Sequence, residues 1–367
     1  MSAVKRNIRT KPSPKNWQGS NRNDCQLLSI TKVDNFIIRE YIPCMATKER
    51  LASLLEREDG KFISGEAIAE ILGITRAAVW KNIRLLQEDG YLIEAVKNRG
   101  YRLTGANDVL SPGSVTKYLG GAAEEFSLEV TGSVTSTNTV MKERADSLPD
   151  WHVLIAQSQS EGRGRSGRSF YSPAETGLYI SIIQRPDIPA WQATKITTAA
   201  AVAACRAIEE CTGESAGIKW VNDVYVRNRK VCGILTEASF SMETGELEWV
   251  IMGIGFNVYE PQGGFPEDIA HIAGAISTER IKDLRSRMAA SFMKHFRDLC
   301  RDLNASDFYS EYRKRSFIIG RQITVFKAEG PVNAEAVGID DECRLEVVYG
   351  DGTRETLSSG EVSIRTV

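Results

Sequence analysis

The sequence predicts a multidomain α+β protein made of an N-terminal winged helix-turn-helix, a central α/β domain and a small C-terminal β-barrel. Three features of the pattern lead to this prediction. Short helices joined by a glycine turn precede two short strands, longer helices and strands then alternate, and five short strands with glycine turns end the chain. At about 150 residues per domain, a length of 367 residues is sufficient for two or three domains with cores of their own.

Composition and charge exclude several classes of protein. Lys and Arg number 46 against 48 Asp and Glu, which excludes a histone-like polycation and an acidic disordered tail. The seven cysteines are odd in number and form no CxxC pair, which indicates a reduced, cytoplasmic protein without a disulfide framework. The three histidines are scattered, so we expect no structural metal. The longest apolar stretch, near residues 199–204, is far shorter than the roughly 18 residues of a membrane span, and we expect no membrane partner.

Residues 1–45 are predicted to form no stable domain. Their basic residues outnumber their acidic ones, and they show no sustained hydrophobic period. The apolar core of a secretory signal is missing after the basic start. The segment is therefore either a poorly ordered extension or sequence upstream of a native start at Met45, because periodic structure begins directly after that residue.

Residues 46–106 predict a winged helix-turn-helix domain. The first helical pattern begins at Ala46, the second runs from the N-cap Ser64 to Gly73, and the third runs from the N-cap Thr75 to Gly90. A turn of about three residues with a glycine joins the second and third helices, as in a helix-turn-helix.

Two short strand patterns, residues 91–95 and 101–103, flank a basic turn and predict a β-wing. The third helix and the wing tip present side chains suited to phosphates and base edges in a major groove. These candidate DNA-binding residues are Thr75, Arg76, Trp80, Lys81, Arg84, Lys97 and Arg99. Because 10 basic and 9 acidic residues give residues 46–106 a charge of only +1, a winged helix used for protein contact is the alternative.

The rest of the chain divides into two further parts. A boundary at residues 105–108 precedes a domain of residues 111–317, in which strands alternate with longer helices. The expected strands are residues 128–130, 153–157, 178–184 and 217–220, and the expected helices are residues 138–145 and 190–211. Residues 318–367 follow as a small closed barrel. Its expected strands are residues 322–327, 333–339, 344–349, 354–357 and 362–364.

Two motifs match well-known signatures but lack the required context. Residues 162–167 read GxGxxG, but the following residues are extended and the next strand begins near Leu178, which leaves no room for the helix of a dinucleotide site. A kinase is excluded because the chain has no HRD or DFG sequence. Residues 213–217 read GxSxG, but they join a helix to a strand, the reverse of a nucleophile elbow.

The first of these loops holds chemistry of another kind. Arg163, Arg165 and Arg168 are interleaved with three glycines. Arginine forks bind phosphate or carboxylate oxygens, and glycine lets the backbone come within hydrogen-bonding distance of a ligand. We therefore expect a mobile cationic lid that closes on an anion. A solvated basic turn and a second nucleic-acid patch are the alternatives.

Five further motifs lie at the ends of predicted strands, where the ligand sites of α/β sheets gather. They are Ser136-Thr137-Asn138, Gln159, Lys219-Trp220-Val221-Asn222-Asp223, the run from Lys230 through Gly233 to Glu237, and the run from Gly253 through Gly255 to Asn257. With these motifs in this order and at this spacing, the chain from about Ala46 to its C-terminus resembles the biotin protein ligases, specifically the bifunctional ones that also repress biotin synthesis genes.

The resemblance implies a fold, an activity and a set of partners. The central domain would be related to class II aminoacyl-tRNA synthetases, and the barrel would be SH3-like. The enzyme would use ATP and Mg²⁺ to convert biotin into biotinyl-5′-AMP. It would then transfer the biotinyl group to a lysine of a biotin carboxyl carrier protein, in acetyl-CoA carboxylase or another biotin-dependent carboxylase. Binding of the adenylate would favour a homodimer whose paired wings bind palindromic operator DNA.

The resemblance also implies roles for individual residues. The motif at Ser136 would meet the ureido ring of biotin, Arg163 would orient the carboxylate and phosphate, and Asn257 would contact the adenylate. The implied biotin-binding residues are Ser136, Thr137, Asn138, Gln159, Arg163, Gly164, Arg165, Lys230, Gly233, Gly253 and Gly255. The implied catalytic and adenylate residues are Arg163, Arg165, Arg168, Lys230, Asn222, Asp223 and Asn257. Asp223 would coordinate Mg²⁺ or, alternatively, steer the incoming carrier lysine.

Three positions depart from the family pattern. Val221 replaces a usual proline, Phe170 replaces a common tryptophan, and residues 160–161 replace a small pair with Ser-Glu. These departures concern the geometry of the loops and the stability of the lid. Three other functions stay open at this point: a related lipoate ligase, a ligase whose winged helix does not bind DNA, and a transcription factor that senses biotin without catalysis.

Overall fold

The computed structural model describes residues 31–33, 36–38, 47–88, 90–105, 107–241, 246–303, 306–327, 330–358 and 360–364. The chain forms two compact units, Met1–Ala46 and Thr47–Val367. In the first unit, strands β1 (Thr31–Val33) and β2 (Phe36–Ile38) pair antiparallel. The predictions for the remainder of residues 1–45 lie outside the described residues. Within the described part of the chain, no helix is both long and apolar enough to span a membrane.

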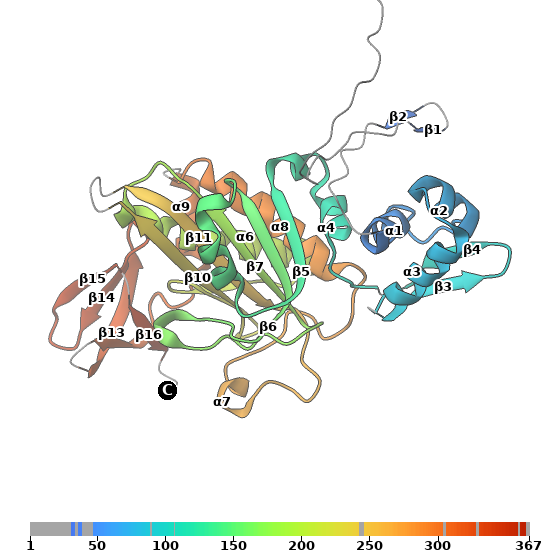
Figure 1. Cartoon of the computed structure of the whole chain (residues 1–367). Helices are drawn as coiled ribbons and strands as arrows, with labels where there is room; N and C mark the ends of the chain where they lie inside the picture. Colours follow the sequence, from blue (N-terminus) through green and yellow to red (C-terminus); the bar gives the residue numbers. More distant parts are fainter. Residues whose placement is uncertain are drawn as a thin grey trace, which may run out of the picture. The chain divides into compact units, whose positions relative to one another are not determined.

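The second unit begins with the predicted winged helix. Its elements are α1 (Thr47–Arg57), α2 (Gly65–Leu72), α3 (Arg76–Glu88), β3 (Ile93–Val96) and β4 (Gly100–Leu103) (Figure 1). Both predicted N-caps are formed: the Ser64 hydroxyl accepts a bond from the backbone of Ala67 at 3.0 Å, and the Thr75 hydroxyl accepts one from Ala78 at 3.2 Å. Gly73 ends α2 in the left-handed conformation at φ 66°. The helix-turn-helix and wing predictions are confirmed.

The central domain is built on a seven-stranded sheet in the order β5-β6-β7-β11-β10-β9-β8. Only β5 and β6 pair in parallel, and the other neighbours are antiparallel. The strands are β5 (Ser127–Val134), β6 (His152–Gln159), β7 (Gly177–Gln184), β8 (Gly217–Lys219), β9 (Asp223–Val226), β10 (Arg229–Phe240) and β11 (Leu247–Asn257). Because the sheet is mostly antiparallel, the carboxyl ends of its strands do not meet at one edge. Gln159, Lys219 and Asn257 end strands β6, β8 and β11, whereas Gly233, Gly253 and Gly255 lie within β10 and β11.

The helices cover the two faces of this sheet unequally. Helices α6 (Ala193–Thr212) and α8 (Leu284–Cys300) run side by side and contact its strands (Figure 1). They enclose the main core, into which the even-numbered residues of β7 point. The short helix α5 (Thr137–Glu143) packs on the odd-numbered residues, on the opposite face. The remaining helices are α4 (Pro112–Leu119), α7 (Glu267–Ala270) and α9 (Ser306–Arg315).

The C-terminal part is a five-stranded antiparallel sheet of the SH3-like barrel type, in the order β15-β14-β13-β12-β16. Its strands are β12 (Gln322–Lys327), β13 (Gly330–Ile339), β14 (Leu345–Tyr349), β15 (Arg354–Leu357) and β16 (Glu361–Ile364), close to the predicted ranges. Its buried residues Ile323, Ala336 and Val347 are continuous with the core of the central domain. The barrel therefore packs against the central domain through a shared apolar core.

Candidate active site

The floor of the candidate site is bare backbone. Gly233 on β10 and Gly255 on β11 lie directly opposite each other in the sheet, and Gly253 lies two residues further along the same face. A Cβ atom at Gly255 would lie 2.4 Å from the ring of Phe170, and one at Gly253 would lie 2.1 Å from Asn138 Oδ1. The glycines are therefore required because the lid and α5 approach the sheet closely there.

Neutral polar groups form one wall above this floor. Residues 136–138 open α5 and are almost fully buried. Gln159 Oε1 accepts hydrogen bonds from the Thr137 backbone at 2.8 Å and from its hydroxyl at 3.1 Å. Asn138 Oδ1 accepts a bond from Ser181 at 2.6 Å, while Asn138 Nδ2 donates to Glu237 at 3.0 Å. The two amide side chains are thus held in fixed orientations, as recognition of a neutral polar ligand requires.

The arginine loop closes on itself without forming an α-helix. The backbone of Gly164 donates to the Arg168 carbonyl at 2.7 Å, and the backbone of Phe170 donates to the Gly162 carbonyl at 2.7 Å. A single 3₁₀ turn, Arg165–Gly167, occupies the tip. The strand β7 follows at Gly177, which confirms that residues 162–167 are not a dinucleotide fingerprint. Residues 213–217 likewise join α6 to β8 and form no nucleophile elbow.

A second loop brings the predicted catalytic side chains under the lid. Asn222 Nδ2 donates to the Ile234 carbonyl at 2.7 Å, and Arg165 Nη1 from the lid donates to Asn222 Oδ1 at 3.2 Å. Lys230 Nζ lies 2.6 Å from Asp223 Oδ1. Two hydrogen bonds from outside the sheet support this loop: Trp220 Nε1 donates to the Cys343 carbonyl of the barrel at 2.9 Å, and the Tyr312 hydroxyl of α9 donates to the Val221 carbonyl at 3.0 Å.

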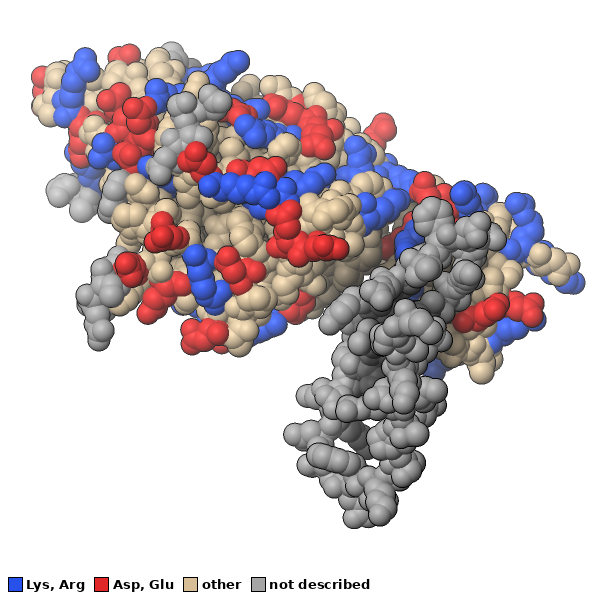
Figure 2. All heavy atoms as spheres, turned by 90° about the horizontal axis from the view of Figure 1, so that it is seen from above, with Lys and Arg blue, Asp and Glu red and all other residues tan. Residues whose placement is uncertain are grey.

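The cleft enclosed by these elements is strongly cationic. Its described lining contains five basic side chains, Arg163, Arg165, Arg168, Lys219 and Lys230, and one acidic side chain, Asp223. Basic and acidic side chains are interspersed on the face of the molecule that Figure 2 shows. The positive charge of the cleft suits a ligand that carries carboxylate or phosphate groups.

Nearly all of the residues predicted for this chemistry line the cleft. They are Ser136, Thr137, Asn138, Gln159, Arg163, Gly164, Arg165, Arg168, Asn222, Asp223, Lys230, Gly233, Gly253 and Gly255. Asn257 is not among the described lining residues; it ends β11 opposite Gly177, and its carbonyl accepts a bond from Ile276 at 2.9 Å. Three residues of the strand separate it from Gly253.

Sequence reasoning missed several residues that shape the cleft. Phe170 packs over Gly233 and Gly255 and meets Tyr179 edge-on with ring centroids 6.4 Å apart. Gly360 and Val362 reach the cleft from the barrel. The substitution of Phe170 for tryptophan was a signal for the first feature. No sequence pattern near the C-terminus indicates the second, because it depends on how the barrel packs.

Cysteine thiols and clusters of metal-binding side chains would be alternative reactive groups among the described residues. The five described cysteines, Cys205, Cys211, Cys232, Cys300 and Cys343, are free. Burial raises the pKa of the Cys205 thiol to about 12 and that of Cys343 to about 11, so neither is a ready nucleophile. No group of three or more His, Cys, Asp or Glu side chains gathers in the part of the chain that is described.

A separate surface holds the predicted DNA-binding side chains. Thr75, Arg76, Trp80, Lys81, Arg84, Lys97 and Arg99 are all exposed. Trp80 is 57% exposed, and the Arg84 guanidinium lies 5.3 Å from its ring centroid. A groove between α3 and the wing is lined in part by Arg76, Trp80 and Lys97. On the wing side, Arg99 and Arg102 flank the Phe62 ring at 4.2 and 4.6 Å.

Comparison with known families divides the chain in the same way. The model described as "HTH domain" matches residues 47–102. The model of the "Biotin/lipoate A/B protein ligase family" matches residues 130–257. The model of the "Biotin protein ligase C terminal domain" matches residues 318–365.

Individual relatives match over almost their whole length. The bifunctional ligase/repressor BirA of Bacillus subtilis (strain 168) is 32% identical over 317 residues, which cover 85% of this chain and 97% of that protein. The corresponding protein of Escherichia coli (strain K12) is 27% identical, covering 84% and 94%. The solved biotin protein ligase from Aquifex aeolicus in complex with biotin and ATP has a TM-score of 0.53 at 24% identity, covering 65% of this chain and 99% of that one.

Proposed function

The chain belongs to the bifunctional ligase/repressor family of biotin protein ligases, and we propose that its cleft activates biotin with ATP and transfers it to a carrier protein. In the first step the biotin carboxylate attacks the α-phosphorus of ATP, forming biotinyl-5′-AMP and releasing pyrophosphate. In the second step a carrier lysine attacks the acyl carbon and AMP leaves. The observation that supports both steps is the juxtaposition of a neutral polar pocket and a cationic lid over one glycine floor.

The neutral end of the cleft suits the ring system of biotin. A ureido group is uncharged and offers both donors and acceptors, which match the fixed amides of Asn138 and Gln159. The backbone of Gly233 and Gly255 and the ring of Phe170 offer an apolar surface for the rest of the molecule. This arrangement binds by shape and hydrogen bonding, without net charge.

The cationic end of the cleft is suited to the first step, in which two negatively charged groups, the biotin carboxylate and the α-phosphate of ATP, must approach each other. Arg163, Arg165 and Lys230 line the part of the cleft where the lid faces the catalytic loop. Their charges lower the repulsion between carboxylate and α-phosphate and hold both groups for in-line attack. Closure of the lid would also exclude water from the reactive mixed anhydride.

Mg²⁺ accompanies ATP and supplies charge neutralisation at its phosphates. The carboxylate of Asp223 and the amide oxygen of Asn222 are the hard oxygen donors that this cleft offers to it. One carboxylate together with substrate phosphates is a usual ligand set for Mg²⁺, so Asp223 and Asn222 are suitable ligands for this ion. The alternative role for Asp223 is to steer the carrier lysine. With Asp223→Asn, loss of pyrophosphate exchange favours the Mg²⁺ role, whereas normal exchange with slow transfer favours the lysine role.

The winged helix supports a second activity, operator binding by an adenylate-bound homodimer. The exposed cations on α3 and the wing are the groups that contact phosphates and base edges in winged-helix proteins. We assign residues 46–106 to this DNA-binding domain, residues 111–317 to the ligase domain and residues 318–367 to the barrel. The proposed partners are therefore a carrier protein, operator DNA and a second copy of this chain, and a membrane is not one of them.

One experiment tests the ligase proposal. The protein is incubated with biotin, MgATP and a biotin carboxyl carrier domain, and the carrier is examined by mass spectrometry. Addition of one biotinyl mass is expected, together with biotin-dependent ATP–pyrophosphate exchange. Exchange with lipoate but not with biotin would instead assign a lipoate ligase, and a protein that binds biotin without exchange would be a sensor only.

A second experiment tests the repressor proposal. A mobility-shift assay uses the promoter of the protein's own biotin genes, with and without biotin and ATP. An adenylate-dependent shift is expected, and the affinity should fall steeply as salt is raised because phosphate contacts release counterions. If no shift occurs even at low salt, the winged helix does not bind DNA.

A further inference from the structure

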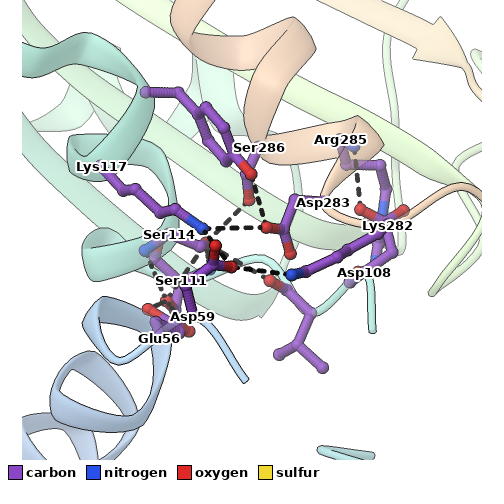
Figure 3. Close-up of polar contacts among 12 residues, drawn as sticks. Glu56, Asp59, Asp108, Ser111, Ser114, Lys117, Lys282, Asp283, Arg285 and Ser286 are labelled. Atoms are coloured by element: carbon purple, nitrogen blue, oxygen red, sulfur yellow. Dashed lines mark hydrogen bonds and ion pairs between the residues drawn. The ribbon is translucent and has the colours of Figure 1, made fainter. Parts of the chain in front are cut away.

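A buried carboxyl group lies at the contact between the winged helix and the ligase domain. Glu56, in the last turn of α1, is only 8% exposed. The Ser111 hydroxyl, at the N-cap of α4, donates to its carboxylate at 2.8 Å (Figure 3). The Tyr91 hydroxyl also donates to this carboxylate, at 3.2 Å. Among the described residues, no ion pair includes Glu56. A buried carboxylate that receives only hydroxyl donors is poorly compensated for its charge.

Ion pairs surround this carboxyl group at the rim of the contact. Asp59, just after α1, lies 3.5 Å from Lys117 on α4 and 2.8 Å from Lys282 before α8. Lys117 also reaches Asp283 at 3.4 Å, and Asp283 accepts a bond from the Tyr118 hydroxyl at 2.6 Å (Figure 3). These pairs are partly exposed, so each contributes little by itself. The protonation state of Glu56 therefore affects the stability of this contact more than the partly exposed ion pairs around it do.

The segment that connects the winged helix to the ligase domain, residues 108–110, is held by buried contacts on both sides. Asp108 pairs with Arg285 at 3.1 Å and accepts a bond from the Tyr259 hydroxyl at 2.7 Å. The next residue, Val109, packs on the core of the winged helix, and Leu110 is buried in the core of the ligase domain. Among the described residues of this contact, Glu56 on the face between α1 and α4 is an ionisable group that forms no ion pair.

The groups that face Glu56 come from every element around it. Tyr91 follows α3, Lys117 lies on α4, and Asp283 precedes α8. Burial is the largest influence and raises the pKa of the Glu56 carboxyl to about 7, with Asp283 adding to the rise and Lys117, Ser111 and Tyr91 opposing it.

We propose that Glu56 is a positioning residue: its protonated carboxyl holds the winged helix against the ligase domain, and its ionisation loosens this contact and weakens DNA binding. The inference rests on the proposed DNA contact by α3 and the wing. A fixed winged helix presents α3 in one orientation, whereas a loosened one must be ordered when DNA binds, which lowers affinity. The ligase cleft is formed by other residues and does not depend on Glu56.

The direction of the pH effect follows from linkage. In the loosened state Glu56 is in water and its pKa returns to the ordinary 4.5, whereas in the docked state it is about 7. The docked state therefore binds more protons between these values, and docking is strongest at low pH and weakens as pH rises through about 7. Between about pH 6 and pH 8 the docking equilibrium should fall by about tenfold.

The test measures DNA affinity against pH with the full-length chain. The probe is a fluorescein-labelled duplex that the wild-type protein selects from a random pool with biotin and MgATP present. Anisotropy is read at about pH 6 and about pH 8, again with biotin and MgATP present and at constant ionic strength. Wild type should bind about tenfold more weakly at the higher pH. Glu56→Gln, whose neutral amide can still accept from Ser111, should bind equally at both. Glu58→Gln makes the same charge change two residues away and should retain the wild-type pH dependence.

Two further measurements report on folding and on docking independently of DNA binding. Biotin-dependent pyrophosphate exchange should be equal in the three proteins at each pH, which shows that the variants are folded. Small-angle X-ray scattering should show wild type, but not Glu56→Gln, expanding between about pH 6 and pH 8. Equal pH dependence in wild type and Glu56→Gln, in either assay, overturns the inference. If wild type binds no duplex at either pH, the proposed DNA contact fails, and the scattering experiment alone decides on Glu56.

Discussion

Gly255 shows how one missing side chain defines the cleft. Its position opposite Gly233 leaves only backbone under the ring of Phe170, and a Cβ atom there would lie 2.4 Å from that ring. We expect Gly255→Ala to force Phe170 out of place and to raise the KM for biotin by about fivefold or more, since overpacking of this kind costs about 1–3 kcal/mol. Steady-state pyrophosphate exchange at varied biotin concentration measures this change.

Two companion variants test the cause. Gly121→Ala adds the same methyl group where nothing lies within 4 Å, and it should leave KM unchanged. Phe170→Ala combined with Gly255→Ala should recover part of the lost affinity, because the overlapping ring is removed. An unchanged KM in the single variant Gly255→Ala would show that the lid does not pack on the floor during catalysis.

Arg163 is the lid residue for which a loss of function is most readily predicted. It lines the cleft with Arg165 and Lys230, and in the proposed reaction the biotin carboxylate meets the α-phosphate beside it. Arg163→Ala should slow adenylation by about 100-fold or more and release the adenylate faster. Pyrophosphate exchange and the decay of bound adenylate without carrier measure the two effects. Arg354→Ala, on the exposed surface of the barrel, is the matched control, and an equal loss there would refute a specific role.

At the scale of elements, charged side chains fasten α6 to α9. Arg315 lies 2.7 Å from Glu209 on α6 and 2.8 Å from Glu311 on its own helix, and Arg206 also pairs with Glu311. The hydrogen bond from Arg315 lowers the pKa of the Glu209 carboxyl below its usual 4.5. Its contribution to stability is therefore present above about pH 4.5 and is lost as pH falls through the lowered value.

This linkage gives a measurable stability profile. The melting temperature of Glu209→Gln should lie below that of wild type at neutral pH, and the two should converge as acid protonates Glu209 in wild type. Thermal unfolding followed by circular dichroism across this range provides the comparison. Glu335→Gln, at an exposed position of the barrel, should follow the wild-type curve throughout. Parallel curves for Glu209→Gln and wild type would contradict the assignment.

Element boundaries were predictable where local chemistry sets them. Ser64, Gly73 and Thr75 mark helix ends through hydrogen bonds and backbone angles that depend on a few neighbouring residues. The order of the strands in the sheet could not be predicted from the sequence in the same way. The antiparallel pairing that sets Gly233 against Gly255 joins residues from two strands, and neither strand shows by its own pattern which neighbour it takes.

At the scale of the whole molecule, the barrel supports the candidate active site. It accepts the Trp220 hydrogen bond through Cys343, and Glu342 lies 3.1 Å from Lys195, a residue of α6 that is only 2% exposed. A chain shortened to end at residue 317 should therefore lose pyrophosphate exchange and unfold at a lower temperature, because the catalytic loop loses a support and the shared core is opened. Exchange at the wild-type rate would show that the barrel is dispensable.

The site could be predicted from the sequence to the extent that its residues lie in short motifs. Asn138, Arg163 and Lys230 were placed in one cleft by their resemblance to a family, and the structure brings them together. Gly360 and Val362 enter from the barrel, and Ser181 fixes Asn138 from a neighbouring strand. These contributions depend on tertiary packing, which no local pattern encodes.

The bare floor of the cleft also limits how its ligand range can be engineered. A pocket is usually enlarged by trimming the side chains beneath it, but Gly233, Gly253 and Gly255 have none to trim. Room for a bulkier analogue has to come from the walls, where Phe170 and Asn138 stand over the sheet. Replacement of Phe170 by a smaller residue is the change that leaves the fixed amides of the polar wall in place, and so it is the first position at which to seek a ligase for modified biotins.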